Sequence, residues 1–383
     1  MRNENTSKGI TVYLEGQIDT TNAEKTGSEI VEIRNANLDG ALILDCENLK
    51  YISSAGLRQI LRLKKSNKDF KIINVNSELY GIFDMTGFTE MMDIQKAYRS
   101  VSIEGCEILG EGSNGIVYQI NPDTIIKVYK NNNALSEIKR EIDLARKALV
   151  MGVNTAIPYD IVKVNNNFGA IFELINCKSL SKWILEDPEN EDKYIKVFVD
   201  VLKDIHNTEV KEGVLPNEKE IALDWVRYLN GHIDEQHYNK LYKLIEDVPE
   251  SNMMIHGDYH SNNVHYNKQE AILIDMDTIA HGNPIFEWAC IYNAYIGFGI
   301  TDVSKVERFL KIKYEHAGEI FRKALQLYCG KEDIEDEIYK CKAIGLARVL
   351  RRTLKRDPEN ITFIEETKKQ LFEAIDKVDT LVL

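Results

Sequence analysis

Three oxygen-bearing side chains have the types and the spacing that phosphoryl transfer requires. Asp258 and Asn263 lie five residues apart in the segment HGDYHSNN (residues 256–263), and Asp275 follows the apolar run 271–274. Phosphoryl transfer needs an oxygen base aimed at the acceptor hydroxyl and oxygen ligands that hold Mg²⁺ against the nucleotide phosphates. We therefore predict that Asp258 is the catalytic base and that Asn263 and Asp275 bind the metal.

The surrounding sequence indicates how these side chains could converge. Asp258 and Asn263 are expected on one loop, so one can face the acceptor and the other a metal. The run AILI (residues 271–274) is typical of a buried strand that ends at Asp275. Asp and Asn are also common in solvated turns, where they cap helices or bind the local backbone. Taken alone, the loop is compatible with either interpretation.

A glycine-rich segment upstream, GEGSNGIV (residues 110–117), is the second signal. In Rossmann sites the third glycine of such a motif opens a helix. Here the β-branched and aromatic run IVYQI (residues 116–120) follows, which predicts the tip of a hairpin. A hairpin loop that covers phosphates is the kinase arrangement. The predicted nucleotide-binding residues of this segment are Gly110, Gly112, Ser113, Asn114, Gly115 and Val117.

The next predicted strand, TIIKVY (residues 124–129), carries Lys127 between apolar residues, which suggests an ionic partner. Glu141 lies in the helical pattern from 135 to 151 and could form the ion pair that orients Lys127 toward the α- and β-phosphates. Glu137 lies one turn earlier on the same helix face and is the alternative partner. For either glutamate, a solvated helix face is the competing interpretation.

At these residues the chain resembles the aminoglycoside phosphotransferase and choline kinase superfamily, which has a protein-kinase-like fold. The family's catalytic loop is H-G-D-x-H-x-x-N, and residues 256–263 fit it with Asp258 as the catalytic aspartate. Its I-D-W-x-D motif is similar to residues 274–277, with Met276 in place of the aromatic residue. The resemblance implies that Asn263 and Asp275 hold Mg²⁺, that ATP or GTP donates the phosphoryl group, and that a small-molecule hydroxyl accepts it.

The resemblance covers roughly residues 105 to 350. The segment FELI (residues 172–175) stands at the family's interlobe hinge, so Glu173 and Ile175 are expected to bind the adenine through backbone groups. Residues 282–289, GNPIFEWA, replace the family's G-D-P-x-x-D-L-A. Asn283 and Glu287 depart from that motif, which leaves the local hydrogen-bond network in question.

Three alternatives concern the same half of the chain. His256, His260 and His265 could ligate zinc, although no helical pattern surrounds them. The domain could also bind nucleotide without transfer, although all the transfer residues are present. Aromatic residues of the C-terminal part could form a wall for a cationic acceptor or simply belong to the core. These aromatic residues are Trp183, Trp225, Tyr228, Trp288 and Tyr292.

The first hundred residues have a different organisation. Short apolar strands at residues 11–14, 41–44 and 71–75 alternate with helical stretches, which predicts a small α/β domain. Ser54 lies near a predicted helix N-terminus, where the helix dipole would stabilise a phosphoserine. The alternative is that Ser53 or Ser54 only caps this helix.

Three segments of this half resemble the STAS domain of anti-sigma factor antagonists. Residues 14–19 match its opening strand and turn, residues 51–57 its phosphorylatable loop, and residues 83–88 its closing helix motif. The resemblance implies that Ser54 is aligned with the serine that a partner kinase phosphorylates, and that the domain docks a partner protein or senses a ligand. Ser53 stands where many such regulators carry an acidic residue.

We predict two domains: an α/β STAS-like domain at residues 1–100 and an α+β bilobal kinase-like domain at residues 105–383. The N-lobe should cover about residues 105–175, and the C-lobe, which should be helical, about 176–383. The net charge of −13 argues against general binding to nucleic acid or anionic membranes. Six scattered cysteines, no leader peptide and no apolar run of about twenty residues suggest a cytoplasmic protein.

The predicted function is Mg²⁺-dependent transfer of a nucleoside triphosphate's γ-phosphoryl group to a small-molecule hydroxyl, with a regulatory or docking STAS domain. The alternative is a regulatory protein. In that case the kinase-like half phosphorylates Ser54, or responds to nucleotide and controls a partner protein.

Overall fold

The computed structural model describes residues 1–383 except 7–8, 38, 113–114 and 132–134. The chain forms two compact units. The first consists of Met1–Ser102 with Val162–Asn166, and the second of Ile103–Ile161 with Asn167–Leu383. Within the described residues, no helix has the length and apolar composition needed to cross a membrane.

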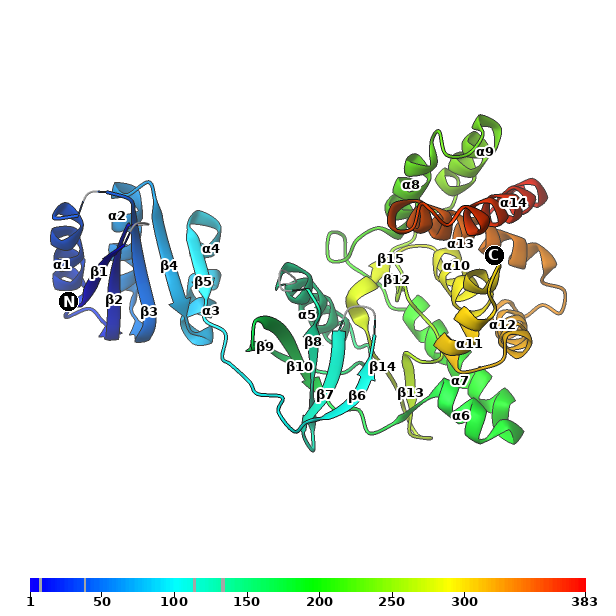
Figure 1. Cartoon of the computed structure of the whole chain (residues 1–383), viewed down its shortest axis with the longest axis horizontal. Helices are drawn as coiled ribbons and strands as arrows, with labels where there is room; N and C mark the ends of the chain where they lie inside the picture. The colour runs from blue at the N-terminus through cyan, green and yellow to red at the C-terminus, as the bar shows by residue number, and fades with distance from the viewer. Residues whose placement is uncertain (7–8, 38, 113–114, 132–134) are drawn as a thin grey trace. The chain divides into compact units, whose positions relative to one another are not determined.

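The first unit contains a five-stranded sheet in the order β1-β2-β3-β4-β5, drawn in blue to cyan in Figure 1. Strands β2 to β5 are parallel, and β1 pairs with β2 in the antiparallel direction. Its strands are β1 (Asn3–Thr6), β2 (Gly9–Ile18), β3 (Ala41–Ile52), β4 (Phe70–Val75) and β5 (Asp93–Lys96), and its helices are α1 (Ala23–Asn35), α2 (Ser54–Ser66), α3 (Ser77–Met85) and α4 (Phe88–Met91). The predicted α/β class is confirmed.

The core of this sheet follows from its strand sequences. Ile10, Val12 and Leu14 alternate along β2 and are almost completely buried. The parallel register places Ile10 beside Leu42 and Val12 beside Leu44 of β3. Burial of such aliphatic side chains stabilises the fold by roughly 1.5–3 kcal/mol each.

Helix α2 begins directly after β3, and its first turn separates the roles of two neighbouring serines. Ser53 has extended backbone geometry and is the N-cap, because its hydroxyl accepts a hydrogen bond from the Gly56 N–H at 3.3 Å. Ser54 is the first helical residue, and its side chain is exposed. Ser53 therefore caps the helix, and the Ser54 hydroxyl is accessible.

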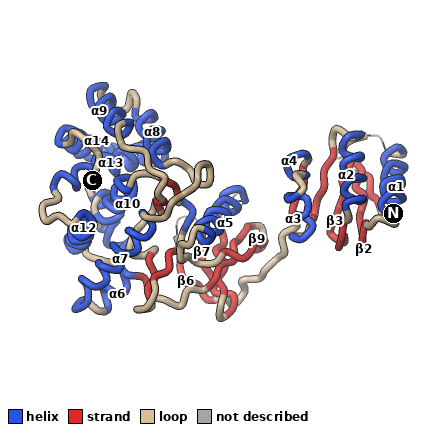
Figure 2. The backbone as a smooth tube through the Cα atoms, turned by 180° about the vertical axis from the view of Figure 1, so that it is seen from behind, coloured by secondary structure: helices blue, strands red, loops and turns tan. Residues whose placement is uncertain are grey.

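The second unit begins with an antiparallel sheet in the order β6-β7-β8-β10-β9, against which α5 packs. Figure 2 shows these strands gathered in one part of the unit, while helices make up most of the remainder. The elements of this N-lobe are β6 (Glu107–Glu111), β7 (Gly115–Asn121), β8 (Thr124–Tyr129), α5 (Leu135–Val150), β9 (Pro158–Val164), of which residues 162–164 are counted with the first unit, and β10 (Asn167–Glu173).

The rest of the second unit is helical, with short strands that carry the loops of interest. Strand β11 (Lys178–Ser179), β13 (Val264–Tyr266) and β14 (Ala271–Leu273) form one small sheet, and β12 (Met254–Ile255) pairs with β15 (Ala280–His281). The helices are α6 (Leu180–Glu186), α7 (Glu191–His206), α8 (Glu218–Leu229), α9 (Glu235–Glu246), α10 (Pro284–Tyr295), α11 (Ser304–Leu310), α12 (Tyr314–Cys329), α13 (Glu335–Arg356) and α14 (Ile361–Lys377), with short 3-10 turns η1 (Pro188–Asn190), η2 (Met276–Thr278) and η3 (Gly297–Gly299).

Two helices form the centre of this lobe. Helix α10 is apolar on all sides and is buried over nearly its whole length, as expected for a core helix. Helix α13 packs against α8, α10 and α14. The predicted bilobal α+β class with a helical C-lobe is confirmed.

The two serines at the start of α2 should respond differently to substitution. Ser53→Ala removes the cap, which typically costs about 1 kcal/mol, so the Gly56 amide should exchange its hydrogen about fivefold faster. Ser54→Ala should leave this exchange unchanged. Hydrogen-exchange mass spectrometry of the full chain measures both, and equal protection in the Ser53→Ala variant would contradict the assigned cap.

Candidate active site

The predicted catalytic loop is an irregular segment between β12 and β13. Tyr259 is completely buried and donates a hydrogen bond from its hydroxyl to the Phe198 carbonyl at 2.7 Å, which anchors the loop in the core. The Asp258 side chain beside it is 51% exposed. The Asn263 Nδ2 group donates to the Asp258 carbonyl at 3.0 Å. The loop is therefore anchored to the core by Tyr259, while the Asp258 carboxylate is exposed to solvent.

Gly257 makes the sharp turn before Asp258 possible. Its φ is +81°, and a Cβ at this position would lie 2.5 Å from the Thr278 carbonyl oxygen. The Thr278 hydroxyl also donates to the His256 carbonyl at 2.9 Å. Both contacts bring the catalytic loop close to the segment that follows Asp275, and only glycine fits the crossing point.

Glu287, on the first turn of α10, holds the backbone of the catalytic loop. Its side chain is fully buried and accepts hydrogen bonds from the His256 N–H at 2.5 Å and the Gly257 N–H at 3.0 Å. Asn283 is the N-cap of α10 and accepts from the Ile285 N–H at 3.2 Å. Both departures from the expected motif therefore have defined hydrogen-bonding roles in this chain.

Arg348 of α13 supports the same turn from another direction. Its Nη1 donates to the Gly257 carbonyl at 3.1 Å and also contacts the Cys290 thiol. The guanidinium lies over the Trp225 ring, 5.2 Å from its centroid. The sequence analysis did not identify this residue, because no local pattern links α13 to a loop about ninety residues earlier.

Asp275 stands at the end of β14 in an unusual backbone conformation. Its φ is +64°, a left-handed value that a non-glycine residue rarely adopts and that is often found at functional sites. The Ile274 N–H donates to the Asn263 carbonyl at 3.0 Å, and His256 Nε2 contacts the Ile274 carbonyl at 3.1 Å. These bonds place the two predicted metal ligands, Asn263 and Asp275, on adjoining segments.

Lys127 connects the N-lobe with the end of β14. Its Nζ lies 2.8 Å from Glu141 Oε1 and 3.2 Å from Asp275 Oδ1. The second Glu141 oxygen accepts from the Tyr129 hydroxyl at 2.6 Å, which fixes the carboxylate. Glu141 is buried and Glu137 is exposed, so the structure selects Glu141 as the partner of Lys127.

The charges around Lys127 and Asp258 favour their ionised forms. Desolvation opposes the charge of Lys127, but Asp275 and Glu141 outweigh it and raise the pKa of the ammonium group. Desolvation also opposes the charge of Asp258, yet His260 and Arg348 lower its pKa to about 2. The His260 Nε2 atom lies 3.8 Å from the Asp258 carboxylate.

The residues present suit a divalent cation. Burial, together with the negative charges of Asp275 and Glu141, raises the pKa of Asp277 to about 7. Two carboxylates, those of Glu141 and Asp275, therefore contact the single ammonium group of Lys127. Carboxylate and amide oxygens are the ligands that Mg²⁺ prefers, and the predicted ligands Asp275 and Asn263 are the residues that would hold such a cation.

The glycine-rich segment forms the predicted hairpin between β6 and β7. The Gly112 N–H donates to the Gly115 carbonyl at 2.9 Å, and Lys130 Nζ contacts the Gly112 carbonyl at 3.1 Å. Gly110 lies within β6, and the sheet register aligns Val117 with Lys127. Ser113 and Asn114 lie outside the described residues.

The predicted hinge lines a hollow of about 420 Å³. It is bordered by Asp123, Tyr159, Glu173, Leu174, Ile175, Asn176 and Ile272. The Leu174 N–H donates to the Asp123 carbonyl at 2.8 Å, whereas no partner for the Ile175 N–H occurs among the described residues. The structure therefore places Glu173 and Ile175 at the edge of a cavity.

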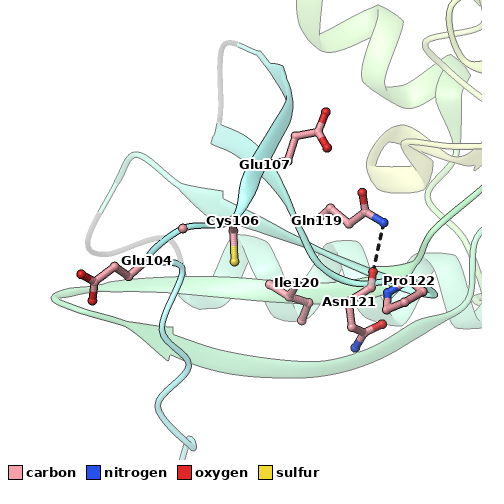
Figure 3. Close-up of a pocket in the computed structure, with 8 residues that line it drawn as sticks. Glu104, Cys106, Glu107, Gln119, Ile120, Asn121 and Pro122 are labelled. Carbon is pink, nitrogen blue, oxygen red and sulfur yellow. Dashed lines mark hydrogen bonds between the residues drawn. The ribbon is translucent and has the colours of Figure 1, made fainter.

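A second hollow, of about 480 Å³, lies where β6 begins and β7 ends, away from the glycine-rich turn between them (Figure 3). It is lined by Glu104, Gly105, Cys106, Glu107, Gln119, Ile120, Asn121 and Pro122. The Gln119 amide donates to the Asn121 carbonyl at 3.2 Å within it. None of the predicted site residues borders this hollow.

The structure places the histidines and aromatic residues of the alternatives in other roles. His256 contacts the Ile274 carbonyl and His265 the Cys177 carbonyl, so these rings face different backbone groups. Trp288 and Tyr292 are buried in the core and do not form a wall for an acceptor. Trp183 stacks on Tyr194, with ring centroids 5.7 Å apart.

Two protein-family models match the chain. Residues 2–102 match the STAS domain, and residues 106–316 match a family described as the phosphotransferase enzyme family. Both resemblances predicted from the motifs are thereby confirmed. No curated protein sequence is significantly similar to this chain.

Solved structures similar to this chain include the ADP-bound crystal structure of aminoglycoside phosphotransferase APH(2'')-Ib, with 15% identity and a TM-score of 0.49 over 79% of this chain and 99% of that chain. The streptomycin–ATP–APH(2")-IIa ternary complex has 17% identity and a TM-score of 0.48 over 73% of this chain and 93% of that chain. The GDP and kanamycin complex of APH(2")-IIIa has 18% identity and a TM-score of 0.48 over 77% of this chain and 97% of that chain.

Removing the Glu287 carboxylate should destabilise the second unit. Glu287→Ala leaves the His256 and Gly257 N–H groups buried without an acceptor, which we expect to cost about 3 kcal/mol or more. Glu287→Gln retains one acceptor oxygen and should cost less. All three tryptophans lie in this unit, so urea unfolding followed by tryptophan fluorescence measures the effect.

Glu246→Ala, at an exposed position on α9, is the control and should change the free energy of unfolding by less than about 0.5 kcal/mol. A loss for Glu287→Ala no greater than that of this control would contradict the bracing role of Glu287.

Stability should also depend on pH through Glu287. Burial raises its pKa from 4.5 to about 8, although the backbone N–H groups of Gly257 and His256 act in the opposite direction. The folded state therefore binds more protons between these values. Glu287's stabilising contribution is fully present below pH 4.5 and is lost as pH rises to about 8, by at most about 1.4 kcal/mol per pH unit.

The comparison of wild type with Glu287→Gln isolates this contribution, because glutamine does not titrate. Urea unfolding at pH 5, 6, 7 and 8 should give a difference between the two proteins that shrinks or reverses as pH rises. A difference that is constant over this range would refute the raised pKa.

Proposed function

The chain belongs to the phosphotransferase enzyme family, and we propose that it transfers the γ-phosphoryl group of ATP or GTP to a hydroxyl of a small molecule with the help of Mg²⁺. The observation that carries this proposal is the contact of Lys127 with both Glu141 and Asp275. It brings a lysine of the N-lobe to a carboxylate of the C-lobe, beside the loop of Asp258. Phosphoryl transfer depends on this kind of positioning and charge stabilisation.

In this proposal, Asp258 accepts a hydrogen bond from the acceptor hydroxyl and orients it toward the phosphorus atom. Its lowered pKa keeps the carboxylate ionised at neutral pH. Arg348 and Glu287 hold the preceding turn from its two sides, so the carboxylate has a defined position. Orientation of the reacting groups is a large contribution to such catalysis.

The nucleotide is held by groups from both lobes. Lys127 binds the α- and β-phosphates, while Glu141 and Tyr129 keep its ammonium group in place. Asn263 and Asp275 would hold Mg²⁺, which supplies positive charge to the phosphate oxygens. The β6–β7 hairpin would cover the phosphates, and the cavity at Glu173 and Ile175 would receive the base.

The STAS domain is assigned a docking or regulatory role toward a protein partner in the cytoplasm. A second candidate function is phosphorylation of Ser54 by the kinase-like half. The observation that favours it is the exposed position of Ser54 at the start of α2, where Ser53 already provides the cap. A phosphate on Ser54 would be stabilised by the helix dipole.

Loss of the proposed catalytic groups should abolish transfer. The full chain is incubated with Mg²⁺, ATP or GTP and a panel of hydroxyl compounds, and phosphorylated products are identified by mass spectrometry. Asp258→Asn and Asp275→Ala should each reduce product formation by about 100-fold or more. Asp247→Asn, at an exposed position after α9, should retain full activity.

Peptide mapping of the same reactions separates the two candidate functions. Phosphate on Ser54 in the wild type but not in Asp258→Asn supports the second candidate, whereas an unmodified chain rejects stable self-phosphorylation. Full activity of Asp275→Ala would overturn the proposed roles of the site residues.

A further inference from the structure

The C-terminal half of α13 carries an unusual concentration of positive charge for an acidic protein. Five cationic residues occur within residues 348–356, in a chain whose net charge is −13. Arg348, Arg352 and Arg356 follow one another at intervals of four residues. They therefore lie on one face of the helix, with neighbouring Cβ atoms about 5–6 Å apart.

This helix face contacts the catalytic loop through Arg348. Arg348 donates to the carbonyl of Gly257, the residue before Asp258, at 3.1 Å. Arg352 follows one turn later on the same face and lies over the Phe298 ring, 5.8 Å from its centroid.

Arg352 has no carboxylate partner in the described part of the chain. Ion pairs of arginine there involve Arg227, Arg308 and Arg322, but not Arg351, Arg352 or Arg356. The Arg351 Nε atom is buried without a hydrogen-bond partner. An acidic chain has many carboxylates that could pair with these cations. Because none does so among the described residues, the guanidinium groups are available to bind an anionic ligand.

The electrostatics of Arg352 agree with this arrangement. Desolvation and the positive charges of Arg356 and Arg348 lower the pKa of Arg352, while the charge of Asp258 acts in the opposite direction. The guanidinium is therefore within electrostatic reach of the catalytic carboxylate. Because Arg348 on the same helix face contacts the residue before Asp258, a compound that binds Arg352 with one end would reach Asp258 with the other.

We propose that the acceptor is an anionic hydroxyl compound, whose phosphate or carboxylate group binds to Arg352 on α13 while its hydroxyl faces Asp258. This proposal rests on the proposed phosphotransferase function and specifies its substrate class. The planar guanidinium group can bind either anion through two parallel hydrogen bonds. A polycationic acceptor would instead meet the positive charges of Arg352 and Arg356.

Binding of simple probes tests this assignment in the full chain. The protein is saturated with Mg²⁺ and AMP-PNP, so that the nucleotide phosphate positions are occupied, and is titrated at constant ionic strength with inorganic phosphate, gluconate or glucosamine. An anionic probe should bind at least about tenfold more tightly than glucosamine. Tighter binding of phosphate than of gluconate identifies a phosphate-bearing acceptor, and the reverse order a carboxylate.

Arg352→Gln should weaken binding of the preferred anion by about tenfold or more, and Arg352→Lys should retain part of it. Arg322→Gln, on α12 and paired with Glu335, is the control and should not change it. Tryptophan fluorescence verifies that each variant is folded. A preference for glucosamine, undetectable anion binding, or equal anion affinity in Arg352→Gln would overturn the proposal.

The two proposals fail in distinguishable ways. Absence of AMP-PNP binding, or transfer that survives Asp258→Asn, counts against the phosphotransferase function. The anion titration is also run without nucleotide, so it tests Arg352 even in that case. Transfer to a cationic compound with full activity in Arg352→Gln would retain the function and reject the anionic acceptor.

Discussion

The N–H groups of His256 and Gly257 are buried and cannot bond to water, so they need a hydrogen-bond acceptor from the protein. The arrangement of the active site depends on the side chain that provides this acceptor. Glu287 of α10 supplies the acceptor oxygens. Arg348 of α13 binds the carbonyl on the other side of the same peptide turn. Because these groups come from two core helices, the position of Asp258 is tied to the packing of the whole C-lobe, and a mutation deep in α10 can act on catalysis.

The second constraint is electrostatic and connects the two lobes of the kinase-like unit. Lys127 stands among carboxylates that would repel one another without it, and it contacts both Glu141 and Asp275. Lys127 and Glu141 are only slightly exposed to solvent, so the loss of either side chain would leave the charge of the other poorly compensated. In the proposed function, the Asp275 carboxylate that contacts Lys127 would also bind the divalent cation. Structure and proposed chemistry therefore use one set of charges.

Family membership defines a reaction class but leaves the acceptor undefined, and the chain's own charges bear on that choice. Arg352 and Arg356 follow Arg348, which contacts the catalytic loop, on one face of α13. Of the aromatic residues considered for a cation site, Trp288 and Tyr292 belong to the core. The STAS domain raises the separate question of whether Ser54 is phosphorylated. Ser54 is exposed, and Ser53 rather than Ser54 caps α2. The proposed acceptor-binding arginines and the proposed phosphorylation site therefore belong to different domains of the chain.

Sequence alone determined the two domain families, the β6–β7 hairpin and the pairing of Lys127 with a glutamate of α5, because short motifs and local periodicity encode each of them. It left Glu141 and Glu137 as alternatives, since both lie on one helix face and only tertiary packing buries Glu141 beside Tyr129. It also missed Arg348 and could not assign a role to Glu287, which act on Gly257 from 91 and 30 residues away. Contacts over such separations depend on how helices pack, and no local pattern records which buried N–H or carbonyl group a distant side chain will reach.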